Sequence, residues 1–404
     1  MKKRKKKWLK FRHRVVRVVA GPIISFLCKL KYGVKIEKFR KQGVHQYLIL
    51  MNHQTPFDQF FVGLAFKGPV YYLATEDIFS LGFLSSLLRW AVAPIPIKKQ
   101  TTDVSAVMNC MRVAKEGGTI ALAPEGNRTY SGKTEYMNPA IASLAKKLGL
   151  PIALYRIEGG YGACPRWSDV VRKGEVRSFV SEVIEPEEYK QLTNEELMKR
   201  IEKGLYVDEG VADGEYRSNK RAEYLERAMY VCPSCGLVSF YSSGDECECL
   251  KCHRKVTYGV DKRIRGVGFD FPFEFVTEWY DYQKEFVNSL QLTEMTDTPL
   301  FCDTAALSEV VVYKNKNKLK KSCEIKLYGD RVVIDEGTDG QLLFKFSDTS
   351  AVSVLGRNKL NIYYRDKVYQ LKGDKHFNAL KYVNIYYRYK NITRGETVGG
   401  FLGL

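Results

Sequence analysis

Strand-like and helix-like segments alternate between about Gly33 and Tyr206, and this alternation limits the possible folds more than any other feature of the chain. Apolar runs with strand character cover residues 47–51, 70–74, 91–97, 119–123 and 152–157. Residues 103–116 and 139–148 have helical periodicity, and each segment is followed by glycine, which commonly ends a helix. The pattern predicts an α/β domain in which helices flank a mixed or mostly parallel sheet.

A short polar motif, Asn52-His53-Gln54-Thr55-Pro56-Phe57-Asp58, follows the first of these strands. The carboxyl ends of strands are where α/β folds place their ligands. A histidine there can accept a proton, and an aspartate nearby can hold its ring and stabilise the imidazolium. The spacing alone also fits an ordinary polar turn, which is the commoner reason for a His and an Asp to stand five residues apart.

Two further strand ends carry groups suited to a phosphate. The sequence Pro124-Glu125-Gly126-Asn127-Arg128-Thr129 follows strand 119–123, and Lys98 and Lys99 follow strand 91–97. Glycine lets a backbone approach a ligand closely, and arginine offers a planar fork to a phosphate. Taken singly, each stretch also fits a solvated surface turn.

The joint pattern is more specific than its parts. Asn-His-x4-Asp, then a basic strand end, then Pro-Glu-Gly-x-Arg about seventy residues after the histidine resembles the PlsC-type glycerolipid acyltransferase family, the 1-acyl-sn-glycerol-3-phosphate acyltransferases. A fourth family block, an apolar strand that starts with proline, is matched at Pro151. The resemblance covers roughly residues 35 to 205.

The resemblance implies a mechanism and a set of site residues. His53 would be the general base that takes the proton from the free hydroxyl of a lysophospholipid, and Asp58 would orient it. The hydroxyl then attacks the thioester of acyl-CoA or acyl-carrier protein. Contacts to the glycerol phosphate would come from Lys99, Glu125, Gly126 and Arg128. Lys99 stands where the family usually has arginine, and Asn138-Pro139 stands where it usually has Lys-Gly, which leaves the acceptor open.

The charge predicts an anionic partner. The chain has 404 residues and a formal net charge of +18, and bases crowd its first 14 residues without any acid. Residues 2–30 interleave these bases with Trp8, Phe11 and aliphatic side chains, and are broken at Gly21-Pro22. This composition favours a segment in the interface of an anionic membrane, although a basic tail followed by a core helix is an alternative. Residues 78–97 are a second candidate for membrane contact, or else a buried helix.

The sequence has no convincing secretory signal and no apolar run of about 18 residues, which a spanning helix requires. We therefore expect a peripheral or monotopic protein at the cytoplasmic face of the cell membrane.

Four cysteines form two CxxC pairs, Cys232 with Cys235 and Cys249 with Cys252, about a dozen residues apart. This is the spacing of a structural zinc site and resembles a zinc ribbon. The thiolates of a reducing interior would hold Zn2+ with no open coordination position. Cys247 and His253 are alternative ligands, and free thiols are the alternative to a metal.

After Pro299 the pattern changes to short strands at 309–313, 323–327, 331–335, 342–346, 351–355, 360–364 and 368–371, followed by a helix at 375–390. Seven strands closed by a helix resemble a bacterial pleckstrin-homology-like (PH-like) domain. Lys314, Lys316, Lys318, Lys320 and Lys321 are expected in the loop after its first strand. They fit an anionic head group or a solvated hairpin tip.

The predicted organisation is a basic membrane-interface segment (1–32), an α/β acyltransferase domain with a mixed sheet flanked by helices (33–225), a zinc ribbon (226–258), a helical linker (259–298), a β-rich PH-like domain with a C-terminal helix (299–391) and a tail (392–404).

The predicted function is acyl transfer to a lysophospholipid, with 1-acyl-glycerol-3-phosphate the favoured acceptor, in phospholipid biosynthesis. The alternatives are another lipid acceptor, or a non-catalytic zinc-ribbon module for nucleic acid or anionic lipid. We do not expect nucleic acid as a partner, because the ribbon carries Asp245, Glu246 and Glu248.

Overall fold

The computed structural model describes residues 7–43, 45–75, 79, 83–97, 103–310 and 316–396. The chain divides into two compact units. Unit 1 comprises Met1–Thr129, Lys133–Ala163 and Lys173–Glu209. Unit 2 comprises Tyr130–Gly132, Cys164–Arg172 and Gly210–Leu404.

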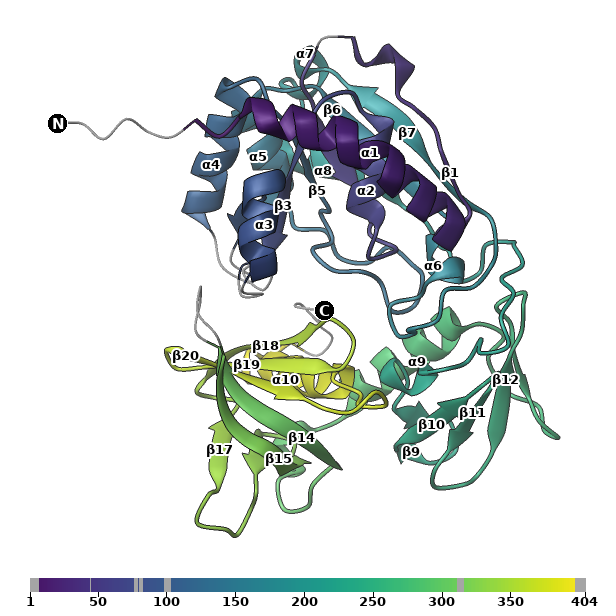
Figure 1. The fold of residues 1–404 in the computed structure, drawn as a ribbon. Helices are drawn as coiled ribbons and strands as arrows, with labels where there is room; N and C mark the ends of the chain where they lie inside the picture. Colours follow the sequence, from purple (N-terminus) through teal and green to yellow (C-terminus); the bar gives the residue numbers. More distant parts are fainter. Residues whose placement is uncertain are drawn as a thin grey trace. The chain divides into compact units, whose positions relative to one another are not determined.

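Unit 1 is built on a seven-stranded sheet in the order β1-β7-β6-β2-β5-β3-β4 (Figure 1). Its strands are β1 (Val34–Ile36), β2 (Leu48–Met51), β3 (Val70–Thr75), β4 (Ile95–Ile97), β5 (Thr119–Leu122), β6 (Ile152–Glu158) and β7 (Val176–Ile184). Neighbouring strands run parallel except for β6 and β7, which are antiparallel. The mixed sheet confirms the α/β prediction for this part of the chain.

Helices cover both faces of this sheet. They are α1 (Phe11–Tyr32), α2 (Asp58–Ala65), α3 (Phe83–Ala91), α4 (Val104–Lys115), α5 (Ala140–Leu148), α6 (Gly160–Ala163), α7 (Pro186–Tyr189) and α8 (Asn194–Leu205), with a 3-10 turn η1 (Arg40–Gln42). Helices α4, α5 and α8 pack on the face that carries Leu48, Leu50 and Leu154. Successive strand residues point to opposite faces, so Tyr155 faces the other way. The ring of Phe66, at the end of α2, lies 6.1 Å from the Tyr155 ring, and α1 packs against α2.

The carboxyl ends of β2 and β5 are adjacent. These strands pair in parallel, with Leu50 opposite Leu122. The chain leaves β2 through α2 toward β3 on one side, and leaves β5 through α5 toward β6 on the other. Because such crossovers are right-handed, the two connections rise on opposite faces of the sheet, and ligands of α/β folds bind at such switch points.

One predicted strand is shorter than expected. The sequence pattern predicts a strand over 91–97, whereas α3 continues to Ala91 and β4 begins only at Ile95. Ala93 has φ +44° and precedes Pro94. A residue before proline is pushed away from the helical region, so the chain turns here instead of continuing as either element. In the described part of the chain, no helix is both long and apolar enough to cross a bilayer.

Unit 2 contains two β layers joined by helical segments. The first is a four-stranded antiparallel sheet of β10 (Phe240–Ser243), β11 (Glu246–Cys249), β12 (Lys255–Tyr258) and β13 (Ile264–Gly266), beside the two-stranded pair β8 (Val231–Cys232) and β9 (Gly236–Leu237). The 3-10 turn η3 (Leu225–Arg227) precedes this region, and helix α9 (Val276–Ser289) and the turn η4 (Leu292–Glu294) follow it. The ribbon sheet therefore extends past residue 258, into the predicted helical linker.

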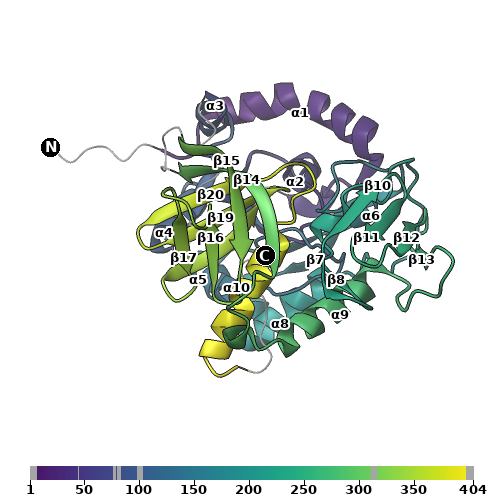
Figure 2. The same cartoon turned by 90° about the horizontal axis from the view of Figure 1, so that it is seen from below.

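The second layer is a seven-stranded antiparallel sheet in the order β17-β16-β15-β14-β20-β19-β18, with helix α10 packed on β18 (Figure 2). Its elements are β14 (Phe301–Val310), β15 (Asn317–Leu327), β16 (Arg331–Ile334), β17 (Leu342–Lys345), β18 (Thr349–Leu355), β19 (Lys359–Tyr364), β20 (Lys367–Lys372) and α10 (Leu380–Thr393). A β-rich C-terminal region closed by a helix was predicted and is confirmed.

The predicted lysine loop differs from the structure. Lys318, Lys320 and Lys321 belong to strand β15 rather than to a loop, and the ammonium of Lys320 pairs with Asp335 at 2.5 Å. Lys314 lies outside the described residues. The loop was expected directly after a strand at 309–313, whereas this stretch is itself a strand that pairs with β14, with Ser308 opposite Lys318 and Leu307 opposite Lys320.

Candidate active site

His53 and Asp58 form a close pair at the carboxyl end of β2. The Nδ1 atom of His53 lies 2.8 Å from the Oδ2 atom of Asp58. The Asp58 side chain is fully buried, whereas the His53 side chain is 24% exposed. A carboxylate can only accept hydrogen bonds, so Nδ1 carries the proton and Nε2 keeps its lone pair. This is the tautomer that a general base requires, with the basic nitrogen on the side away from the aspartate.

Asp58 is held in place by the turn that precedes it. It is the first residue of α2, and its carboxylate accepts the backbone N–H groups of Gln54 at 2.7 Å and Thr55 at 2.9 Å. The Thr55 hydroxyl donates to the other carboxylate oxygen at 2.6 Å. Together with His53 Nδ1, four donors surround the buried carboxylate. The backbone and the Thr55 hydroxyl of this turn therefore fix the position of the Asp58 carboxylate, and the fixed carboxylate in turn orients the imidazole of His53.

Asn52 ties the start of this turn to the neighbouring strand β6. Its side-chain amide donates to the carbonyl of Ile157 and accepts the N–H of Ile157, both at 2.8 Å. Just beyond the same end of β6, Gly160 makes room for the turn, since a Cβ there would lie 2.7 Å from Cβ of Gln54. Both contacts set the position of the His53 backbone relative to the sheet.

Glu125 joins the site from the end of β5. Its Oε1 atom accepts the backbone N–H of His53 at 3.0 Å, which links the two strand-end turns. Burial, together with the charges of Glu135 and Asp58, raises the pKa of the Glu125 carboxyl to about 8, against the opposing effect of hydrogen bonds from the backbone of His53 and Glu135. The side chain therefore holds its proton up to about neutral pH.

The remaining predicted phosphate contacts lie on the same loop or outside the described residues. Gly126 lies in a turn in which its own N–H donates to the carbonyl of Ala123. Its φ is +70°, a backbone conformation that glycine adopts without strain. Arg128 follows two residues later and is partly buried. Lys99 lies outside the described residues, so its predicted role stays a prediction.

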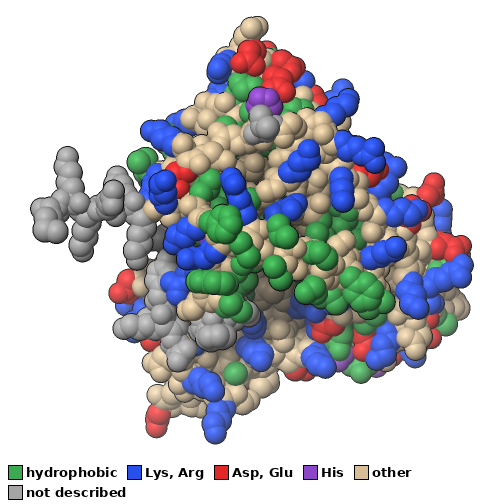
Figure 3. Space-filling view, turned by 45° about the horizontal axis from the view of Figure 1, so that its top comes forward, with side chains coloured by type: hydrophobic (Ala, Val, Ile, Leu, Met, Phe, Trp, Pro, Cys, Tyr) green, Lys and Arg blue, Asp and Glu red, His purple; other side chains and the backbone are tan. Residues whose placement is uncertain are grey.

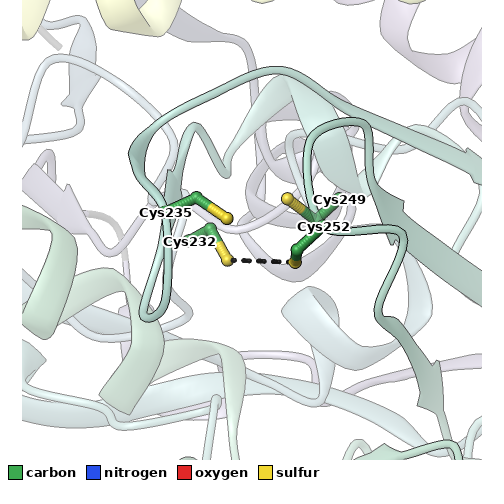
Figure 4. A group of neighbouring side chains, drawn as sticks. All are labelled: Cys232, Cys235, Cys249 and Cys252. Atoms are coloured by element: carbon green, nitrogen blue, oxygen red, sulfur yellow. Dashed lines mark hydrogen bonds between the residues drawn. The ribbon is translucent and has the colours of Figure 1, made fainter.

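The four predicted metal ligands meet in unit 2. The sulfur atoms of Cys232, Cys235, Cys249 and Cys252 all lie within 4.8 Å of one another, and those of Cys232 and Cys252 are 3.9 Å apart (Figure 4). Four thiolates around one zinc at about 2.3 Å would have sulfur–sulfur distances of about 3.8 Å, so the cluster fits such an ion. Neither Cys247 nor His253 belongs to this cluster. The imidazole of His253 instead contacts Glu248 at 2.9 Å.

Helix α1 presents an exposed apolar face. Its exposed hydrophobic residues follow helical spacing and include Val18, Ile23, Phe26 and Leu30, of which Leu30 is 72% exposed. The opposite side of the helix is buried through His13, Cys28 and Tyr32. Trp90 of α3 is half exposed beside it, and the guanidinium of Arg12 lies over the Trp90 ring. Figure 3, which brings this side of the molecule forward, shows hydrophobic side chains gathered among Lys and Arg.

Sequence reasoning pointed to His53 and Asp58, which the structure brings together, but not to the residues that hold them in place. The roles of Thr55 and Asn52 depend on which backbone groups lie nearby, and Gly160 is separated from the motif by about a hundred residues.

Comparisons with known proteins identify similar sequences and structures. Residues 33–156 match the model of the family described as Acyltransferase. Over 175 residues the chain is 23% identical to a chloroplastic 1-acyl-sn-glycerol-3-phosphate acyltransferase of Brassica napus, a match that covers 39% of this chain and 49% of that protein. The chain thus spans about half the length of the curated relative it matches.

Among solved structures, the chain is similar to the 1-acyl-sn-glycerophosphate (LPA) acyltransferase PlsC from Thermotoga maritima. The sequence identity is 21%, the TM-score is 0.40, and the match covers 49% of this chain and 80% of that one. The family match contains both strand-end motifs, and it supports the resemblance inferred from them for residues 33–156.

Proposed function

We propose that this protein transfers a fatty acyl group from acyl-CoA or acyl-carrier protein to the free hydroxyl of a lysophospholipid, with 1-acyl-glycerol-3-phosphate as the favoured acceptor. The observation that carries the proposal is the His53–Asp58 pair at 2.8 Å, at the switch point of an α/β sheet whose sequence matches the acyltransferase family. The named substrate of the Brassica relative supports the choice of acceptor.

The geometry suits a direct transfer without a covalent enzyme intermediate. Nε2 of His53 takes the proton of the acceptor hydroxyl while the hydroxyl oxygen attacks the thioester carbon. A carbon–oxygen bond forms, the carbon–sulfur bond breaks, and the imidazolium returns its proton to the departing thiolate. Asp58 keeps the imidazole in the required tautomer and stabilises its charged form through the 2.8 Å contact. Arg128 and Lys99 would neutralise the acceptor phosphate, and the backbone of Gly126 would allow its close approach.

The proposed place of the reaction is the cytoplasmic face of an anionic membrane. The exposed apolar face of α1 would enter the interface, and the basic residues of the N-terminal segment would contact the head groups. A lysophospholipid presents its hydroxyl and its phosphate at this depth, so a peripheral enzyme meets its acceptor without extracting it. Each exposed Val, Ile, Leu or Phe side chain of this face would contribute about 1.5–3 kcal/mol when fully buried in lipid.

The proposed roles of unit 2 are structural and membrane-related. Zn2+ held by Cys232, Cys235, Cys249 and Cys252 would stabilise the ribbon, because four thiolates leave no coordination position for a substrate. The strand order β17-β16-β15-β14-β20-β19-β18 with the helix α10 supports a PH-like domain. Its exposed Lys318 and Lys321 on β15 are candidates for contact with anionic lipid.

The proposal is tested with the His53→Ala variant and a panel of lysophospholipids offered with one acyl-CoA. We expect the parent protein to acylate lysophosphatidate in preference to the neutral or zwitterionic acceptors, and the variant to lose activity by at least about a thousandfold. Sedimentation with anionic vesicles should be the same for both proteins. A variant that transfers acyl groups at the parent rate would exclude His53 as the base, and acylation of another lipid alone would correct the acceptor.

A further inference from the structure

Resting on the proposed function, we propose that Arg17 and Tyr32 of helix α1 are positioning residues that clamp helix α2, and with it the His53–Asp58 pair, in reactive geometry. Helix α1, whose exposed face is proposed to contact the membrane, would then also hold the active-site residues in position through its buried face. Neither residue touches the reacting atoms.

Arg17 holds the C-terminal end of α2. Its Nη2 atom donates to the carbonyl oxygen of Gly63 at 3.0 Å and to that of Phe66. The last carbonyls of a helix have no partner within the helix and carry the negative end of its dipole, so a guanidinium is a favourable cap. Asp58 occupies the opposite, positive end of the same helix.

Arg17 is an unusual choice for a purely structural cap. Its guanidinium is half-buried, burial lowers its pKa, and its Nε atom is fully buried without a hydrogen-bond partner. Among the described residues, no carboxylate pairs with it. A partly desolvated cation without an acid costs stability, and Arg17 spends that cost on capping the helix that bears Asp58, which points to a functional use.

Tyr32 holds the other end of α2. The side chain is 2% exposed, and its ring centroid lies 5.1 Å from that of Phe57 and 6.0 Å from that of Phe61. Phe57 directly precedes Asp58. Aromatic pairs in this geometry contribute about 0.5–1.5 kcal/mol beyond the burial of their area. The two contacts of α1 are therefore at opposite ends of one short helix.

Two residues of the sheet also contact helix α2 or its C-terminal end. The hydroxyl of Tyr72 on β3 donates to the carbonyl of Gln59 at 2.6 Å, and Phe66 packs against Tyr155 on β6. Helix α2 has only 8 residues, which is too few to be stable on propensity alone. Its position must come from these neighbours, and a displacement of about 1 Å at a catalytic group can lower turnover by about a hundredfold.

The kinetic test compares Arg17→Gln with Arg40→Gln, an exposed arginine of η1 that lies outside the N-terminal segment and serves as the charge-matched control. With anionic vesicles and saturating acyl donor, we expect Arg17→Gln to lower kcat by at least about tenfold more than Arg40→Gln, with equal KM and equal vesicle sedimentation. Arg17→Lys should recover part of the loss, since a lysine can reach one carbonyl. Equal kcat in the two glutamine variants would overturn the proposal, as would a loss that follows vesicle binding.

A second readout does not depend on activity. Hydrogen exchange of the full-length protein should become faster in residues 57–66 of Arg17→Gln while α4, residues 104–115, keeps its parent rate. Unchanged exchange in 57–66 overturns the clamp. If the parent protein transfers no acyl group to any acceptor, the proposed function fails, and exchange alone still decides the clamp. If α4 is also deprotected, Tyr32→Leu repeats the test from the other end of α2.

Discussion

Replacing Asp58 by asparagine tests the orientation of the catalytic imidazole with almost no change in shape. The carboxylate accepts four donors, three of which, His53 Nδ1 and the N–H groups of Gln54 and Thr55, reach Oδ2. The Thr55 N–H also lies 3.0 Å from Oδ1. An asparagine that keeps its oxygen toward Thr55 turns its NH2 group toward His53 Nδ1 and the Gln54 N–H. The Gln54 N–H then loses its acceptor, at a cost of about 1–3 kcal/mol in stability. The imidazole must accept from the NH2 group through Nδ1, so that Nε2 carries the proton and cannot act as a base. We expect kcat to fall by about 10²–10⁴-fold, which corresponds to about 3–5 kcal/mol in the barrier.

The assay is steady-state acyl transfer from one acyl-CoA to lysophosphatidate in mixed anionic vesicles, with thermal unfolding of each protein measured in parallel. Asp103→Asn is the matched control. Asp103 also lies at a helix N-terminus, where its carboxylate accepts the N–H of Ala106 at 3.1 Å, and asparagine is a good cap there. We expect its kcat to equal that of the parent. A folded Asp58→Asn protein whose kcat stays within about threefold of the parent would refute the tautomer argument.

Three further outcomes follow from the structure. Because the pKa of Glu125 is raised to about 8 in the folded protein, the parent should lose stability as pH rises above about 4.5, and Glu125→Gln should not. The free energy of unfolding of the variant relative to the parent should therefore be greater at pH 8 than at pH 5 by about 1–3 kcal/mol. A difference between variant and parent that does not change with pH contradicts this. Cys232→Ser should remove the one zinc expected by elemental analysis and lower Tm, whereas the exposed Cys302 can be replaced by Ser without loss of metal. Val19→Asp on the exposed face of α1 should weaken partition onto anionic vesicles by about tenfold or more, and equal weakening by Val104→Asp on α4 would show that the effect is not specific to α1.

The meeting of these side chains was predictable because each of them belongs to a short motif in the local sequence. A histidine, an aspartate and a glutamate stand directly after apolar runs, and such runs become parallel strands whose ends meet at one edge of a sheet. That rule brings His53 and Glu125 together although 72 residues separate them along the chain. The two CxxC pairs were predictable for the same reason, since each pair is a local turn.

What the sequence did not predict depends on distant partners. The Glu125 side chain was expected on the acceptor phosphate, and the structure places it on the His53 backbone, a contact that requires the register of β2 and β5. The end of α3 and the start of β4 depend on the turn at Ala93, which a run of apolar residues conceals. The hydrophobic periodicity of α1 predicts a helix with one apolar stripe but does not say whether that stripe is covered.

Pro22 within α1 bears on how deeply this helix can sit in a bilayer. Proline has no N–H, so the carbonyl of Val18, one turn earlier, loses its donor within the helix. Hydrocarbon offers no replacement donor, whereas water and lipid head groups do. In the proposed orientation the middle of α1 must therefore stay within reach of the hydrated glycerol layer. A helix limited to that depth would keep the enzyme level with the ester linkages of the lipids, where the free hydroxyl of a lysophospholipid is found.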